Sequence, residues 1–298
     1  MNQDETMHES FVDVRSDQGG LSLHVRDWAG ARSPFVLVHG LSSNLRTWDG
    51  VARALAAAGH RVVSVDQRGH GLSAKAESGY DFATMSEDLH RLLDLLQLEQ
   101  PLLAGQSWGG NVMLDFAARY PRRARGFAFV DGGVLDLQTS GPGAWEQVSI
   151  ELRPPDLAGT PRMALRDMIR THQPEWSEEG IEATLHNFET LPDGTVRSWL
   201  GLERHMKILR ALWEQRPADL YARVQDPVLI CMADEGEGSV WTVAKHRMVE
   251  AALERLPRAQ VKWFHATAHD IHVHRPQELA ALFLHTLAEG IWARREEA

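Results

Sequence analysis

Cysteine is almost absent from this 298-residue chain, because the only one is Cys231, which lies within an apolar run. A lone thiol cannot form an internal disulfide, so nothing in the sequence requires an oxidising compartment. No apolar run reaches the ~18–20 residues that a membrane span needs. The acidic, polar start also lacks the basic and apolar segments of a secretory signal. We therefore expect a cytoplasmic protein without a membrane span.

Basic residues are outnumbered as well. Lys and Arg together number 31 against 41 for Asp and Glu, which gives a formal net charge of −10. This excess disfavours nucleic acid and anionic membranes as partners, since both attract basic patches. An apolar fraction of 43% excludes wholesale disorder and fits a soluble globular protein. A small molecule is the expected partner, and the sequence leaves a homodimer open.

Short apolar runs alternate with helical patterns along most of the chain. The runs that predict strands are 11–14, 21–28, 35–38, 61–66, 101–104, 126–130, 227–232 and 260–264. Helices are expected over 44–58, 84–98, 111–120, 242–256 and 276–288. This alternation predicts an α/β fold, in which a mostly parallel sheet carries helices on both faces.

The alternation breaks in the middle of the chain. Residues 137–222 carry many prolines, short helical patterns and four tryptophans, namely Trp145, Trp176, Trp199 and Trp213. We interpret this segment as a helical cap inserted after the sixth strand, with 1–136 and 223–298 forming the core. Most of the tryptophans are expected to pack within the insertion, and together they favour a roof for an apolar or aromatic group.

The strongest chemical motif is Gly105-Gln106-Ser107-Trp108-Gly109, which matches G-x-S-x-G. It follows a predicted strand and opens a predicted helix, which is the context that gives this motif its meaning. The turn is so tight that the flanking positions have no room for side chains, and the serine Oγ is left exposed above the sheet. We expect Ser107 to be a nucleophile rather than an incidental turn residue.

Over nearly its whole length, the chain resembles the serine-nucleophile branch of the α/β-hydrolase fold family, whose members carry a helical lid. Four motifs in the family order carry the resemblance: the elbow at Ser107, His39-Gly40 after a strand, the turn 66–73, and the segment from His269 to Pro276. The resemblance implies an eight-stranded sheet, a lid at the insertion and no cofactor. It also implies that His39-Gly40 belongs to the oxyanion loop.

A serine needs a base to accept its proton, and His269 is the best candidate. It follows the last strand, and loops that leave the carboxyl ends of parallel strands meet above the sheet. His265, His272 and His274 lie nearby and compete for the role. The four histidines also allow a metal site, but no helical H-E-x-x-H frames them, so we expect no bound metal.

Two positions compete for the acid that orients the base. The usual family position beyond the seventh strand holds Gly236, and Asp234, Glu235 and Glu237 lie close enough that a loop shift would rescue one of them. Asp131 lies at the end of the sixth strand, 24 residues after Ser107, where some family branches place the acid. We prefer Asp131 and keep Asp234 as the alternative. The acid would hold the imidazole tautomer and stabilise the imidazolium.

Two backbone N–H groups should receive the negative charge of a tetrahedral intermediate. The expected donors are Trp108, which follows the nucleophile, and Leu41, which follows the His39-Gly40 pair. Because the backbone supplies these bonds, the large apolar side chains at both positions are not needed for them and instead indicate the shape of the pocket.

These residues predict a serine esterase or lactonase that cleaves a carboxylic ester with an apolar moiety through an acyl-enzyme. C–C bond hydrolysis by the same triad stays open, and so does a haloperoxidase-like side activity. A ligand-binding protein on a hydrolase scaffold is the alternative from another class. A cofactor-dependent oxidoreductase is disfavoured, because the glycines around Ser107 do not form G-x-G-x-x-G and a serine occupies the turn.

Overall fold

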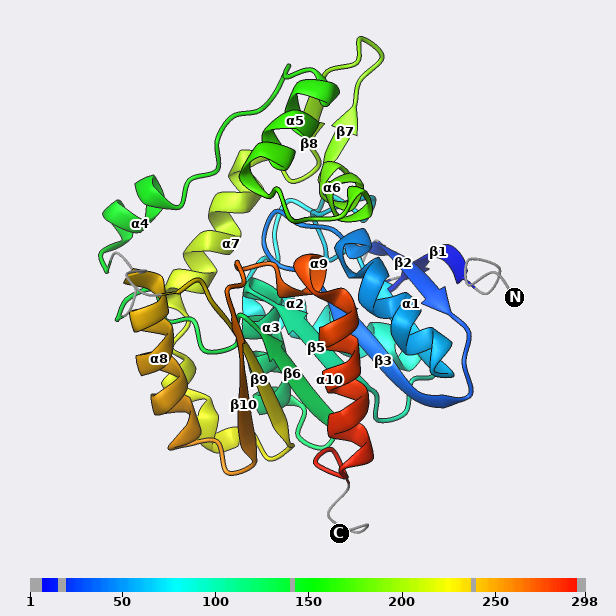
Figure 1. Ribbon diagram of the computed structural model, residues 1–298, viewed down its shortest axis with the longest axis vertical. Coiled ribbons are helices and arrows are strands. Elements are labelled where there is room, and N and C mark those ends of the chain that lie inside the picture. Colours follow the sequence, from blue (N-terminus) through cyan, green and yellow to red (C-terminus); the bar gives the residue numbers. More distant parts are fainter. Residues whose placement is uncertain (1–6, 16–19, 140–142, 237–239, 294–298) are drawn as a thin grey trace.

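The computed structural model describes residues 7–15, 20–139, 143–236 and 240–293, and within them an eight-stranded sheet forms the centre of the molecule (Figure 1). Its strands are β1 (Met7–Asp13), β2 (Ser22–Trp28), β3 (Arg32–Val38), β4 (His60–Val65), β5 (Leu102–Gln106), β6 (Gly126–Val130), β9 (Val228–Asp234) and β10 (Ala259–His265). They are arranged in the order β1-β2-β4-β3-β5-β6-β9-β10. The pairs β1–β2 and β2–β4 are antiparallel and all the others are parallel, which confirms the predicted sheet.

Helices cover both faces of this sheet, as the alternation predicts. One face carries α1 (Asp49–Ala57), which the short 3-10 helix η3 (Leu45–Trp48) precedes, and α10 (Pro276–Ala288). The other face carries α2 (Phe82–Leu95), α3 (Trp108–Arg119) and α8 (Val240–Leu253). Neighbouring strand residues point to opposite faces, so that Leu37 packs with the first group and Val38 with the second. Because helices bury both faces of the sheet, the central strands are apolar without a break.

Most of the stretch between β6 and β9 lies beyond one end of the sheet (Figure 1), and its last residues return along α3. It contains α4 (Trp145–Glu151), α5 (Arg162–His172), α6 (Glu178–Leu185), β7 (Phe188–Thr190), β8 (Val196–Ser198), α7 (Leu202–Glu214) and the 3-10 turns η4 (Pro217–Asp219) and η5 (Tyr221–Arg223). The antiparallel β7–β8 hairpin was not part of the sequence prediction. Its turn, Leu191-Pro192-Asp193-Gly194, carries a Pro-Asp-Gly signal that could have revealed it.

The four tryptophans of this stretch have different surroundings. Trp145 and Trp213 pack against each other, with the Arg210 guanidinium over both rings. Trp199 lies beneath the Lys75 ammonium. Trp176 alone among them lines the cavity that contains Ser107. The roof that the sequence predicts over this cavity is therefore made by one tryptophan rather than four.

No helix in the described ranges combines the length and apolar character that crossing a bilayer requires.

Candidate active site

Ser107 sits at the bend between β5 and α3 in a backbone conformation that L-residues rarely adopt. Its φ is 53° and its ψ is −123°. Such a conformation costs about 1–3 kcal/mol and persists only where the surrounding structure enforces it. Here the Ser107 N–H donates to Val130 O at 2.9 Å, and Ser107 O accepts from Gly110 N at 2.8 Å. These bonds tie the bend to β6 and to the first turn of α3.

Close backbone contacts explain why both ends of the pentapeptide are glycine. A Cβ on Gly109 would lie 2.5 Å from His39 O, and a Cβ on Gly105 would collide with the carbonyl group of Gly109. The side chain of any other residue would push β5, α3 and the loop after β3 apart. The two glycines therefore let the bend pack directly against the His39-Gly40 loop.

His269 and Asp131 are brought together by loops that follow β10 and β6. His269 Nδ1 lies 2.6 Å from Asp131 Oδ2. The Asp131 side chain is fully buried, whereas 45% of the His269 side chain is exposed. His269 lines the same cavity as Ser107, although in the described chain no hydrogen bond joins the two side chains. Catalytic hydrogen bonds are often long before substrate binds.

The two groups shift each other's proton affinity. Burial opposes both charges, but the hydrogen bond and charge of Asp131 still raise the pKa of His269 above its usual value. Burial would likewise raise the pKa of Asp131, yet the hydrogen bond from His269 and the charges of His269 and Lys245 hold it below its ordinary range. Asp131 is thus an ionised acceptor that favours the imidazolium form of its partner.

The alternative acid Asp234 and the histidines that compete with His269 have other partners. Asp234 Oδ2 pairs with His265 Nδ1 at 2.8 Å, and His265 is 78% exposed, so Asp234 does not contact His269. His274 Nε2 lies 3.1 Å from Glu175 Oε2. The ring of His272 packs 4.6 Å from that of Trp48, and burial lowers its pKa to about 3. In the described ranges no group of three or more His, Cys, Asp or Glu is arranged to hold a metal ion.

The residues that carry the predicted oxyanion donors lie near Ser107. Trp108 begins α3 directly after Ser107, and Leu41 lines the cavity with Ser107. Within the described residues, neither backbone N–H donates to another group of the chain. His39 is fully buried behind them: its Nδ1 lies 2.7 Å from Gly40 O and its Nε2 accepts from Gln67 N at 3.1 Å. His39 thus supports the loop.

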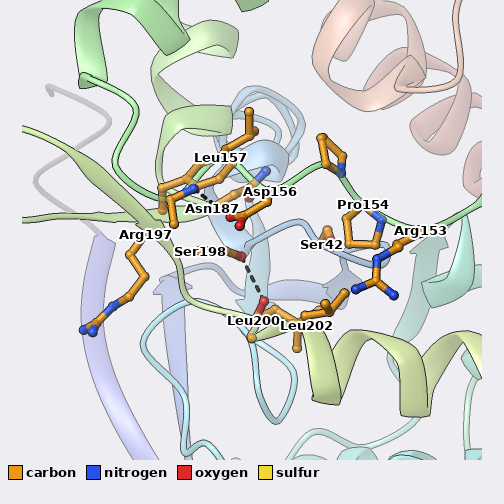
Figure 2. Close-up of a pocket in the computed structure, with 14 residues that line it drawn as sticks. Ser42, Arg153, Pro154, Asp156, Leu157, Asn187, Arg197, Ser198, Leu200 and Leu202 are labelled. Carbon is orange, nitrogen blue, oxygen red and sulfur yellow. Dashed lines mark hydrogen bonds between the residues drawn. The ribbon is translucent and has the colours of Figure 1, made fainter.

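The cavity around Ser107 has a volume of about 160 Å³. Its roof includes Trp176 from the segment between α5 and α6, and Asn187, which follows α6. A larger cavity of about 400 Å³ shares the lining residues Ser42 and Asn187 with it and is also lined by residues of β7 and β8 (Figure 2). This second cavity could not be predicted from the sequence, because it forms only where the insertion meets the loop after β3.

Three polar residues near the Ser107 cavity were also missed. Asp270 lines it, accepts from Gln106 Nε2 at 3.3 Å, and has a pKa that burial raises. Ser42 Oγ lies 2.8 Å from His205 Nδ1, which links the loop after β3 to α7. Lys245 reaches Asp131 from α8. The sequence carried a detectable signal for Lys245, because position 245 falls on the same buried face of α8 as Met248 and Val249.

Comparison with protein-family models identifies one match. Residues 33–179 fit the model of the alpha/beta hydrolase fold. This range begins in β3, contains Ser107 and Asp131, and ends within α6.

Curated relatives carry several different activities in their names. A 107-residue segment is 36% identical to non-heme chloroperoxidase CPO-A1 of Kitasatospora aureofaciens and covers 36% of this chain and 38% of that protein. Another relative, provisionally named carbamate hydrolase RutD in Cronobacter turicensis, is 28% identical over 85% of this chain and 90% of its own length. The chain thus matches little more than a third of the chloroperoxidase.

Solved structures share the architecture at low identity. The crystal structure of E-2-(acetamidomethylene)succinate hydrolase superimposes with a TM-score of 0.78 at 21% identity, covering 95% of this chain and 99% of that one. At this identity the similarity concerns the fold.

Proposed function

Because this chain belongs to the α/β-hydrolase fold family, we propose that it is a serine hydrolase that cleaves a carboxylic ester or lactone with an apolar moiety. The observation that carries the proposal is the 2.6 Å hydrogen bond between His269 and Asp131 beside the cavity that Ser107 lines. A strained serine, an oriented imidazole and a buried carboxylate in one place have a common use in acyl transfer.

In the proposed reaction, Ser107 Oγ attacks the carbonyl carbon while His269 Nε2 accepts the hydroxyl proton. The new C–O bond forms as the carbonyl π electrons move to oxygen, and the N–H groups of Leu41 and Trp108 stabilise that oxyanion. His269 then gives its proton to the leaving alkoxide as the C–O bond of the ester breaks. A water molecule, deprotonated by His269, releases the acid from Ser107 by the same steps.

Asp131 would serve this cycle without being protonated. Its Oδ2 accepts a hydrogen bond from the Nδ1–H group of His269, which keeps that proton on Nδ1 and leaves Nε2 as the unprotonated nitrogen on the side of the cavity. The negative charge of Asp131 offsets the positive charge that His269 acquires at each step. Asp234 is not suited to this role, because its carboxylate is paired with the exposed His265.

The lining of the second cavity supports an apolar moiety in the substrate. Leu157, Phe188 and Leu200 contribute to it, and Arg153 and Asp156 lie among its polar lining residues (Figure 2). Because the two cavities share Ser42 and Asn187, a substrate whose carbonyl group reaches Ser107 can extend an apolar chain beneath the hairpin. We propose that the segment 137–222 acts as the lid that provides this space.

The test is a panel of p-nitrophenyl esters and lactones with graded acyl length, together with an alkyl organophosphonate probe. We expect a burst of p-nitrophenol, faster turnover of medium-length than of acetyl esters, and a phosphonate adduct on Ser107. A folded protein with neither adduct nor turnover would overturn the hydrolase proposal and favour ligand binding. Turnover only of vinylogous diketones would favour C–C bond cleavage by the same residues.

A further inference from the structure

Lys245 is a buried lysine at the acid of the proposed triad. It lies on α8, and only 6% of its side chain is exposed. Its Nζ lies 2.7 Å from Asp131 Oδ2 and 3.1 Å from Ala233 O. Lysine is almost never fully buried without a partner, because the charge must be stabilised inside the protein. The partner here is the carboxylate that also orients His269.

The hydrogen bonds of Asp131 show how the carboxylate is shared. Its Oδ1 accepts from Ala233 N at 2.9 Å. Its Oδ2 accepts from both His269 Nδ1 at 2.6 Å and Lys245 Nζ at 2.7 Å. One oxygen therefore faces two cationic or potentially cationic groups, and the negative charge is not reserved for the imidazole.

We propose that Lys245 is a positioning residue that keeps Asp131 ionised and limits how strongly Asp131 favours protonated His269. The inference rests on the proposed function, because it concerns the same base. A carboxylate that faced the imidazole alone would retain the proton on His269 over a wider pH range. By sharing the charge, Lys245 leaves neutral His269, the form that can accept the Ser107 proton, available at lower pH.

The other titratable groups around His269 do not take over this role. Asp270, next in the chain, is held toward its neutral form because burial raises its pKa. His272 on α9 (Ile271–His274) and His39 after β3 are kept neutral because burial lowers the pKa of each. The Cys231 thiol on β9 is also neutral, since burial raises its pKa. Lys245 is thus the group that opposes the charge of Asp131.

The experiment measures kcat/KM against pH in wild type and Lys245→Met, which removes the charge but preserves most of the side-chain volume. We expect the acidic limb of the pH profile to move to higher pH by about one unit in the variant. At pH values on that limb, kcat/KM should therefore be about tenfold lower than in wild type. At pH 9 the variant should regain most of the wild-type rate. Lys262→Met, which removes an exposed lysine on β10, is the matched control and should leave the limb in place.

A uniform loss of activity at every pH with an unmoved limb, or a limb moved to lower pH, would overturn the inference. Lys245→Gln provides the same test if Lys245→Met does not fold, because glutamine retains a donor near Asp131 without its charge. Labelling of Ser107 in wild type by the organophosphonate distinguishes a failure of the proposed function from a failure of this inference. If wild type is not labelled, the proposed function fails. If it is labelled and only the expected limb shift is missing, this inference alone fails.

Discussion

His269 Nδ1 and Asp131 Oδ2 are 2.6 Å apart, although 138 residues separate them in the chain. The contact forms because β6 and β10 are parallel strands of one sheet, so the loops at their carboxyl ends lie at the same edge. Ser107 follows β5 at that edge. Strand order thus assembles three side chains that the sequence keeps far apart.

Replacing the proposed nucleophile should abolish turnover without affecting the fold. Ser107→Ala removes the only atom proposed to attack the substrate, so kcat should fall by about 10⁴-fold or more. The variant also removes one hydroxyl from a half-buried position, and its melting temperature and circular dichroism should match wild type. Turnover at more than a few per cent of the wild-type rate would exclude Ser107 as the nucleophile.

The loss of kcat on replacing each candidate acid should show which one orients His269. Asp131→Asn preserves the shape but favours the wrong imidazole tautomer, so kcat should fall by about 10³–10⁴-fold. Asp234→Asn weakens the pair with the exposed His265, while the amide oxygen can still accept from Gly236 N, and kcat should change less than about twofold. Initial rates of both variants under saturating ester provide the measurement. A larger loss in Asp234→Asn would assign the acid to Asp234.

The pH dependence of activity follows from the raised pKa of His269. Because only the neutral imidazole can accept a proton, activity should fall as pH decreases through that pKa, with the midpoint above ~6.5. The raised pKa of His269 makes a stability contribution of the opposite sign: it is complete below the unfolded pKa of the imidazole and is lost as pH rises through the folded pKa. A kcat/KM profile that is flat between pH 5 and 8 would contradict a histidine base.

His272 should affect stability rather than catalysis. Its folded pKa of about 3 lies below the unfolded value, so stability is complete above pH ~6.5 and decreases as pH falls toward 3. The penalty at pH 5 is about 2 kcal/mol. His272→Phe should retain the contact with Trp48, remove most of this loss, and change kcat little. Urea unfolding at pH 7 and pH 5 measures the difference, with the exposed His172→Phe as control.

The second cavity can be filled without altering the proposed catalytic groups. Ala158→Trp places a large side chain among the residues that line it. We expect kcat/KM for octanoyl esters to fall at least tenfold, while acetyl esters, which need only the space near Ser107, remain within twofold. Equal effects on both substrates would show that the cavity does not hold the acyl chain.

Much of this arrangement could be predicted from the sequence because its signals are local. The strands are continuous apolar runs, and the elbow is a pentapeptide whose glycines are fixed by contacts with adjacent backbone. The choice between Asp131 and Asp234 could not be made in this way, because both follow neighbouring parallel strands and Val130 pairs with Cys231 in register. Which carboxylate meets His269 depends on the path of one loop.

The features that were missed depend on contacts between distant parts of the chain. Lys245 lies 114 residues from Asp131, and its role depends on which face of α8 packs against the sheet. The cavity of about 400 Å³ is enclosed by the insertion and by Ser42, which belong to different parts of the chain. Periodicity predicts the elements on either side but does not specify the space between them.

Mass-spectrometric identification of the organophosphonate adduct, in wild type and in His269→Ala, tests the central claim most directly. An activated Ser107 predicts one adduct on the peptide that contains this residue in wild type, and labelling at least 10²-fold slower in His269→Ala. An adduct on a different residue, or equally fast labelling of both proteins, would contradict the proposal that His269 activates Ser107.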